Sequence, residues 1–224
     1  MKARLVLLLS ILIIWSGTAQ ELEIYGGGNL TRFYDRVGDY YHNLNKYTPG
    51  PGAQLGLGFE HVKMGPIPIG MTFSLEKYSG KFYVNNVGLG GGSETEAKVE
   101  ATSIHLALYP FNIKLLKRHL EISLGWEASL LLQEKVQGVH KWRVLGIGSY
   151  EKEISDQMYS YSKKLNSGPI GRICYSFAFG KSWELVPQYK FYLGLTRRFQ
   201  NLETDVWYSQ HLFELAIRKN LSSR

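Results

Sequence analysis

The sequence is short of residues that several protein classes require. It has one cysteine, Cys174, in 224 residues, so an internal disulfide and a structural zinc site built on cysteines are both excluded. Its six histidines show no pair at metal-binding spacing, and we expect neither a metal nor a cofactor. Beyond the N-terminal segment, no apolar run approaches the roughly 18 residues that a membrane-spanning helix needs. A hydrophobic content of 44% nevertheless excludes a disordered chain.

The N-terminal segment has the pattern of a secretory signal peptide. Lys2 and Arg4 precede an apolar run over 5–15, and the small residues Gly17 and Ala19 follow it. We therefore predict a signal peptide over 1–19 and one mature domain over 20–224. Removal of the two basic residues lowers the net charge of +7 by two, and export argues against a nucleic-acid partner.

Strict alternation of apolar and polar residues recurs along the mature chain. The clearest case runs over 120–130, where Leu120, Ile122, Leu124 and Trp126 alternate with small or charged residues. A period of two over so many residues predicts a strand. The same period recurs, more weakly in the first case, over 22–33, 54–60, 69–76, 103–108, 172–179, 188–195 and 212–218.

The connections between these eight segments alternate in length. Short turns are expected at 63–68, 112–117 and 181–183, and long outer loops at 35–52, 78–96 and 133–166, with a shorter outer connection at 201–207. Hairpins with short turns on one side and long loops on the other are typical of outer-membrane barrels. The sequence therefore predicts an all-β protein, an eight-stranded antiparallel up-and-down transmembrane β-barrel in the cell outer membrane. Its size excludes a large porin with an open pore.

Small residues indicate which face of the strands points inward. Glycines such as Gly56, Gly70 and Gly125 lie on the polar face, where a crowded interior would require them. The large apolar residues of the other face suit lipid. Aromatic residues near strand ends are expected to form girdles at the membrane surfaces: Tyr25, Tyr78, Tyr109, Phe111, Trp183, Trp207 and Tyr208.

The polar face also carries charges, which in a narrow interior must pair with one another. We predict that they form a salt-bridged core that plugs the barrel. A turn near residue 115 would place His105 opposite Gly125 and Ser103 opposite Glu127. The predicted interior charged cluster consists of Glu60, Glu76, Glu121, Glu127, Arg172, Lys190, Glu214 and Arg218.

The pattern resembles the small outer-membrane β-barrel families of Gram-negative bacteria, and is closest to the PorT-like barrels. The resemblance rests on the Ala19-Gln20 end of the signal peptide, the early Gly26-Gly27-Gly28-Asn29 strand, and the strand end from Ile104 to Phe111 before an inner turn. It spans most of the mature chain. It implies a transmembrane barrel. Such families include barrels with adhesion, envelope-anchoring or secretion-related roles and many with no assigned role.

Three functional interpretations follow. The first is a non-enzymatic outer-membrane barrel whose loop from Gln133 to Asn166 contacts a protein partner, while outer-membrane lipid and lipopolysaccharide surround it. In that loop, Lys135, Lys141 and Arg143 could meet lipid phosphates. The second is a lipid A-modifying barrel enzyme. Its catalytic residues would be a nucleophile, a base and an orienting carboxylate, as in Ser103, His105 and Glu127. The third is a secreted soluble barrel that binds an apolar ligand. The first, which assigns no catalytic, cofactor or metal residues, is preferred.

Overall fold

The computed structural model describes residues 19–35, 45–64, 67–88, 91–116, 119–154, 163–198 and 206–221. Of the expected signal peptide only Ala19 is among them. No helix in these residues is long and apolar enough to cross a membrane. The strands are β1 (Glu21–Asp35), β2 (Lys46–Met64), β3 (Ile67–Gly88), β4 (Gly91–Leu115), β5 (Leu120–Val144), β6 (Gly148–Ile154), β7 (Leu165–Tyr175), β8 (Phe177–Ala178), β9 (Trp183–Leu193) and β10 (Val206–Asn220).

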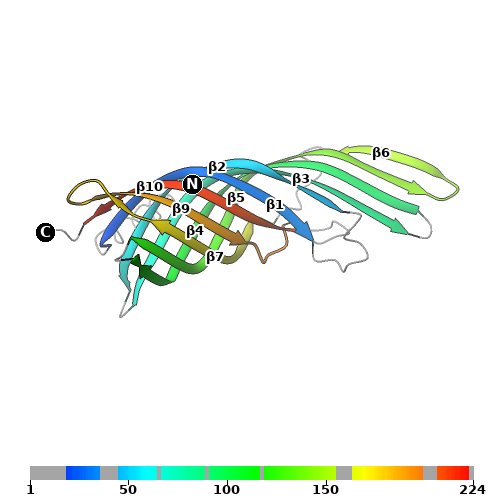
Figure 1. Cartoon of the computed structure of the whole chain (residues 1–224). Coiled ribbons are helices and arrows are strands. Elements are labelled where there is room, and N and C mark those ends of the chain that lie inside the picture. The colour runs from blue at the N-terminus through cyan, green and yellow to red at the C-terminus, as the bar shows by residue number, and fades with distance from the viewer. Residues whose placement is uncertain are drawn as a thin grey trace, which may run out of the picture.

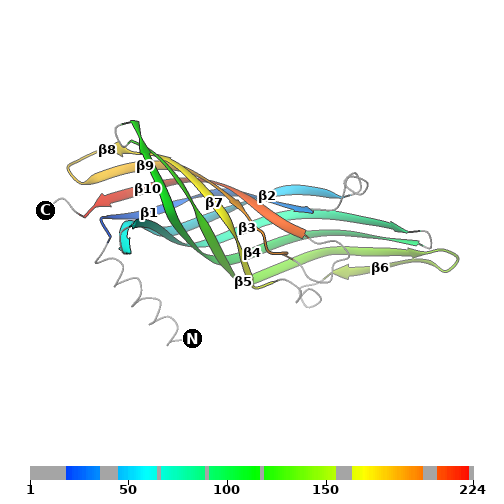
Figure 2. The same cartoon turned by 90° about the horizontal axis from the view of Figure 1, so that it is seen from below.

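Eight of these strands close into a ring. They pair antiparallel in the order β1, β2, β3, β4, β5, β7, β9 and β10, and β10 also pairs with β1 (Figures 1 and 2). The two short strands lie outside the ring order, with β6 paired to β5 and β8 paired to β9. The predicted eight-stranded antiparallel barrel is therefore confirmed. The end with the short turns is called the inner end below, and the opposite end the outer end.

The outward face of the ring is apolar. Leu55, Leu124 and Phe213 are all more than half exposed, although each is a large hydrophobic side chain. The inward face is buried and carries the charged side chains that the alternation predicts, together with a cluster of aromatic and aliphatic ones. This is the reverse of a soluble barrel with an apolar interior, so the secreted soluble alternative does not fit the ring.

Inward glycines make room for large side chains of the neighbouring strands. A Cβ atom at Gly56 would lie 2.4 Å from the Tyr25 ring, and one at Gly70 would lie 2.5 Å from Oε2 of Glu60. Both distances are shorter than any real contact, so the interior is as crowded as the small residues of the polar face predict.

Three ring strands continue far beyond the barrel at its outer end. β3, β4 and β5 contain 22, 25 and 25 residues, whereas β7 contains 11. About 9–11 tilted residues suffice to cross a bilayer. The remaining residues form a projecting sheet with β6 and the first residues of β2 (Figure 1), and we call it the outer sheet.

The prediction of long loops at 78–96 and 133–166 is therefore wrong in form, because most of both segments is strand. Alternation continues into the outer sheet, where Ala97 and Val99 are buried and Lys98 is exposed. The connections at 36–44, 155–162 and 199–205 lie outside the described residues.

The predicted register between 103–108 and 120–130 is also wrong. His105 lies opposite Ser129, and Ser103 lies opposite Leu131. Leu115 pairs with Leu120, so the two strands are offset from a turn centred at 115, and an irregularity follows Leu108. The inward direction of both side chains is unaffected, because the shift is by an even number of residues.

Candidate functional site

Charged side chains at the inner end form a network around two arginines. Arg172 Nη1 lies 2.6 Å from Glu60 Oε1, and Arg172 Nη2 lies 2.9 Å from Glu121 Oε1. Arg218 Nε donates to Glu23 Oε1 at 2.5 Å, and Arg218 Nη1 lies 3.5 Å from Glu121 Oε2. Glu121 thus bridges the two arginines. We call these five residues the arginine network.

The arginine network is almost completely buried, with every member at 3% exposure or less. Arg172 also donates to Ser123 Oγ at 3.1 Å, and its guanidinium lies 4.6 Å from the centre of the Tyr109 ring. Ionised groups removed from water in this way are stable only when they are paired and hydrogen-bonded. The network therefore holds strands β1, β2, β5, β7 and β10 together from inside.

A second ion pair joins β9 to β10. Lys190 Nζ lies 2.9 Å from Glu214 Oε2 and 4.0 Å from the centre of the Tyr25 ring. The buried ammonium therefore has a carboxylate on one side and an aromatic face on another, and both favour its charged form.

His105 is the centre of a third group. Its Nδ1 lies 2.8 Å from Glu127 Oε1, and its Nε2 lies 2.9 Å from Glu76 Oε2 and 2.6 Å from Ser103 Oγ. Glu76 also accepts hydrogen bonds from Asn29 at 2.6 Å and from a glutamine of β10. The imidazole therefore connects two buried carboxylates.

The Ser103, His105 and Glu127 side chains do meet, as a hydrolytic triad would require. His105 Nε2 is hydrogen-bonded to Ser103 Oγ, and Glu76 Oε2 lies 2.9 Å from the same nitrogen. A carboxylate at each ring nitrogen favours a doubly protonated imidazolium, which cannot accept the serine proton. Ser103 and His105 are each 2% exposed, facing inward, so acyl chains at the lipid face do not reach them. The geometry is that of an ion-pair hub.

The structure places all eight predicted interior charges in buried positions. It divides them among the arginine network, the Lys190–Glu214 pair and the His105 group instead of one continuous cluster. Glu23 was not predicted, because glycines interrupt the alternation of the first strand. Its alternation with Leu22 and Ile24 was the available signal. Within the described residues, no group of histidine, cysteine or acidic side chains has the geometry to hold a metal ion.

The aromatic girdle prediction is only partly right. Phe111 and Trp183 are exposed on the outward face, where a girdle belongs. Four predicted members are buried because their positions point inward: Tyr25, Tyr78, Tyr109 and Tyr208. Trp207 is also buried, although it is the strand partner of the outward-facing Tyr34 and stacks on its ring. Tyr78 and Tyr208 stack inside the barrel with ring centres 5.6 Å apart.

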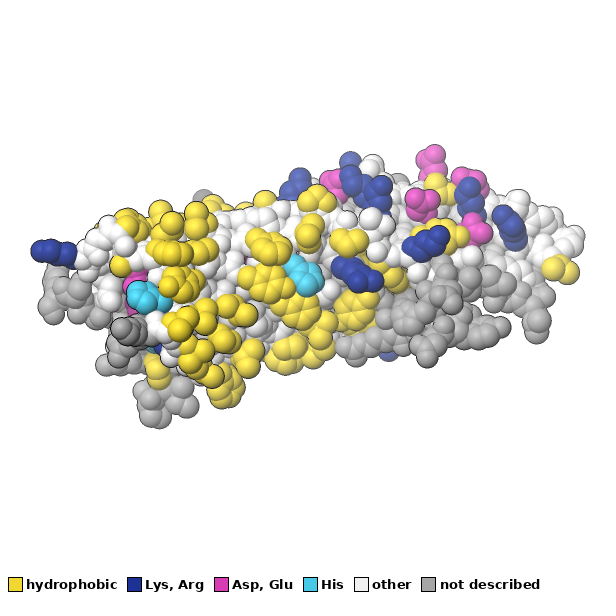
Figure 3. All heavy atoms as spheres, in the orientation of Figure 1, with side chains coloured by type: hydrophobic (Ala, Val, Ile, Leu, Met, Phe, Trp, Pro, Cys, Tyr) yellow, Lys and Arg dark blue, Asp and Glu magenta, His cyan; other side chains and the backbone are white. Residues whose placement is uncertain are grey.

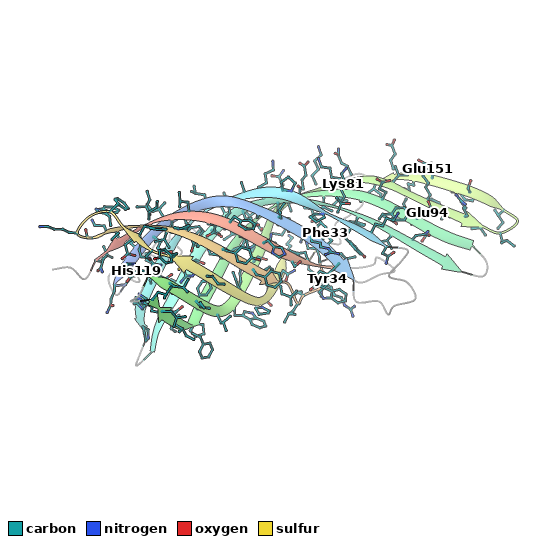
Figure 4. The ribbon with its side chains drawn as sticks, viewed as in Figure 1. Phe33, Tyr34, Lys81, Glu94, His119 and Glu151 are labelled. Atoms are coloured by element: carbon teal, nitrogen blue, oxygen red, sulfur yellow. The ribbon has the colours of Figure 1, made fainter. Side chains whose placement is uncertain are left out.

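The outer sheet has one charged face. Lys81, Glu94 and Glu151 project from it (Figure 4), and ion pairs connect its strands, such as Lys141 Nζ to Glu151 Oε2 at 3.3 Å. A hydrogen bond from Lys98 holds the pKa of the exposed Glu100 carboxyl below its ordinary value. Charges of both signs on an exposed sheet face suit contact with water and polar partners.

The hairpin formed by the outer part of β5 and by β6 ends in an apolar tip. Leu145 and Ile147 are 80% and 69% exposed, and Gly146 between them has a φ of 78°. Below the tip, the Trp142 and Tyr150 rings stack with centres 5.7 Å apart. Exposed aliphatic side chains this far from the barrel are typical of contact surfaces.

The closed ring and its apolar outward band define the class of this protein. In lipid every backbone polar group must be paired, which a closed barrel achieves, and barrels of this type lie in outer membranes. The protein is an integral outer-membrane β-barrel, at the location that the sequence predicts.

No family model matches the sequence, and no curated protein matches it. Among solved structures it is similar to Neisserial surface protein A, at 10% identity over 89% of this chain and 97% of that chain, with a TM-score of 0.42. It is similar to OprG from Pseudomonas aeruginosa, at 13% identity over 90% and 96%, with a TM-score of 0.38. It is also similar to Ail from Yersinia pestis, at 10% identity over 89% and 99%, with a TM-score of 0.34. These likenesses are low, and the fold is established by the strand pairing itself.

Proposed function

We propose that this protein is a non-enzymatic outer-membrane barrel that presents its outer sheet to an envelope or external partner. The observation that carries the proposal is the length of β4 and β5, which at 25 residues each exceed by more than twofold what crossing the membrane requires. A ring strand that continues into the sheet holds that sheet in a constant orientation to the membrane.

The barrel interior is closed to solutes in this proposal. Its support is the burial of large side chains inside the ring, among them Tyr109, Arg172 and Tyr192, which have at most 1% exposure. An eight-stranded barrel encloses only enough space for its own side chains. Purified protein in a planar lipid bilayer is expected to give no stable single-channel conductance, and a stable conductance would contradict the closure.

The partner surface in this proposal is the outer hairpin within the segment from Gln133 to Asn166. Lys135, Lys141 and Arg143 lie on the charged face of the outer sheet, where phosphate groups of surrounding lipopolysaccharide can approach them. The apolar tip then remains available for a protein partner. A lipid A-modifying activity is less favoured, because Ser103 and His105 are buried inside the barrel, away from the lipid face.

The test is removal of the hairpin without damage to the barrel. Gly138 and Ile154 face each other across β5 and β6, so residues 139–153 can be replaced by a two-residue Asn-Gly turn. We expect an unchanged heat-modifiable band on gels and loss of cross-linked partners in intact cells. The matched control keeps the hairpin and replaces only Leu145 and Ile147 by serine, which tests the tip alone. Cross-linked species that persist after the deletion would refute the assignment of the partner surface.

A separate variant tests the basic residues through the binding of purified lipopolysaccharide. Replacing Lys135, Lys141 and Arg143 by alanine is expected to weaken binding and to reduce its dependence on salt, because surface charge contacts are screened. Unchanged binding and salt dependence would show that the basic residues do not contact lipopolysaccharide.

A further inference from the structure

The lipid-facing wall contains polar groups where hydrophobic residues are expected. The Tyr189 hydroxyl and His211 Nδ1, on β9 and β10, are hydrogen-bonded at 2.6 Å on the exposed face. The His211 ring lies 5.1 Å from the centre of the Phe191 ring. Figure 3 shows hydrophobic side chains gathered over the barrel with histidine among them. With the tyrosine as donor to Nδ1, Nε2 of the imidazole carries a proton, and among the described residues it has no hydrogen-bond acceptor.

A cation lies on the same wall. Arg32 of β1 is exposed, and its strand neighbour on β10 is Ser209, two residues from His211. Arg32 makes no ion pair within the part of the chain that the structure describes. An unpaired arginine on the lipid face of a barrel is unfavourable unless it meets an anion or the headgroup region.

The depth of Arg32 in the membrane follows from its neighbours. Tyr34, the next outward-facing residue of β1, stacks on Trp207 with ring centres 6.3 Å apart. Such an aromatic pair belongs at the outer membrane surface. Arg32 and His211 therefore lie just inside that surface, at the level of lipid phosphates.

An apolar groove of about 600 Å³ begins below this polar group and extends toward the inner end. Gly26 and Pro187 lie on either side of Leu215 in the strand register, and neither fills the space beside it. Arg32 lies six positions after Gly26 in β1, a distance of roughly 20 Å along the strand. The groove is lined chiefly by Gly26, Ile173, Tyr175, Pro187, Phe213 and Leu215.

We propose that this wall binds one lipid A molecule of the outer leaflet. A phosphate lies against Arg32 and His211 Nε2, and one acyl chain lies in the groove. The proposal depends on the relative position of the polar group and the groove. Arg32 and His211 lie near the outer surface, and the apolar groove lies below them. That is the orientation of an outer-leaflet lipid. The inference rests on the placement of the barrel in the outer membrane, and it adds a defined lipid site to the proposed function.

The experiment is native mass spectrometry of the folded barrel in detergent with added hexa-acylated, bisphosphorylated lipid A. One variant combines Arg32→Ala with His211→Phe, and another, Gly26→Leu, fills the groove. A Cβ atom at Gly26 would meet only ordinary contacts at 3.5 Å, so the backbone there tolerates a side chain. Leu215→Trp fills the same groove if Gly26→Leu does not fold.

Two control variants leave the proposed site intact. Lys81→Ala removes an exposed cation of the outer sheet that belongs to neither proposed lipid contact, and Gly171→Leu adds a side chain at another outward glycine, whose Cβ would lie 3.6 Å from a leucine. Folding of every variant is checked by heat-modifiable gel migration.

We expect one lipid A per wild-type barrel, with affinity about tenfold weaker in the double variant and in the groove variant and unchanged in both controls. Removing the phosphates from lipid A should weaken its binding to the wild-type barrel at least as much as the double substitution weakens the binding of intact lipid A. Equal affinity for lipid A in wild type and both site variants would overturn the proposal. Equal binding of phosphatidylglycerol would replace lipid A by a phospholipid and overturn it as well.

Membrane fractionation separates this test from that of the proposed function. Absence of the protein from outer membranes would refute the placement. Unchanged lipid A binding in a correctly located barrel would refute the site alone.

Discussion

Replacing Arg172 by alanine should destabilise the barrel strongly. Arg172 contacts Glu60 at 2.6 Å and Glu121 at 2.9 Å, and Glu23 lies 3.8 Å away. Glu121 and Glu23 keep contacts with Arg218 after the substitution. Glu60 does not, because Arg172 is its only ion-pair partner among the described residues. The variant therefore leaves one buried carboxylate without a counter-charge.

Removing one partner of a buried ion pair typically lowers the free energy of unfolding by about 3–5 kcal/mol. We expect a loss in that range for Arg172→Ala. A second substitution, Glu60→Gln, removes the uncompensated charge and keeps the shape of the side chain. The double variant should therefore recover more than half of the loss, which a simple cavity at position 172 would not allow.

The assay is urea unfolding of the barrel in lipid vesicles, followed by tryptophan fluorescence. Lys98→Ala is the control, since the Lys98–Glu100 pair is exposed, and we expect no measurable change. A loss below about 1 kcal/mol for Arg172→Ala would refute the reasoning. So would a double variant no more stable than Arg172→Ala alone.

Three further predictions test the interior. Gly56→Ala should lower the free energy of unfolding by about 1–3 kcal/mol, because its Cβ would lie 2.4 Å from a tyrosine ring. Gly26→Ala, at an outward position, should leave it unchanged, and equal effects of the two substitutions in urea unfolding would contradict the assigned faces. Lys190→Met should lower the free energy of unfolding by about 3–5 kcal/mol in the same assay, and adding Glu214→Gln should restore most of that loss. A double variant no more stable than Lys190→Met alone would contradict a buried ion pair. Wild type and Ser103→Ala should release no fatty acid from lipid A by mass spectrometry, and serine-dependent release would establish an enzyme.

Much of the ring was predictable because strand alternation is a local property. The period of two assigns each side chain of a strand to one face without knowledge of the partner strand. For this reason Arg172 and Lys190 were correctly expected inside, and Leu124 and Phe213 outside. The crowding at Gly56 was predictable on the same grounds.

Contacts across the barrel depend on the tertiary structure, because register shifts and loop lengths act between distant segments. Local alternation could not show that Glu76 would meet His105 and turn an apparent triad into an ion-pair hub. It also could not show that most of the described residues of 78–96 and 133–154 are paired strands, since these strands are stabilised by hydrogen bonds to one another in the outer sheet. The sequence by itself determined the strands and their faces. Only the closure of the ring decided which buried charges meet, because pairing positions more than 100 residues apart, such as Glu60 and Arg172, depends on every register between them.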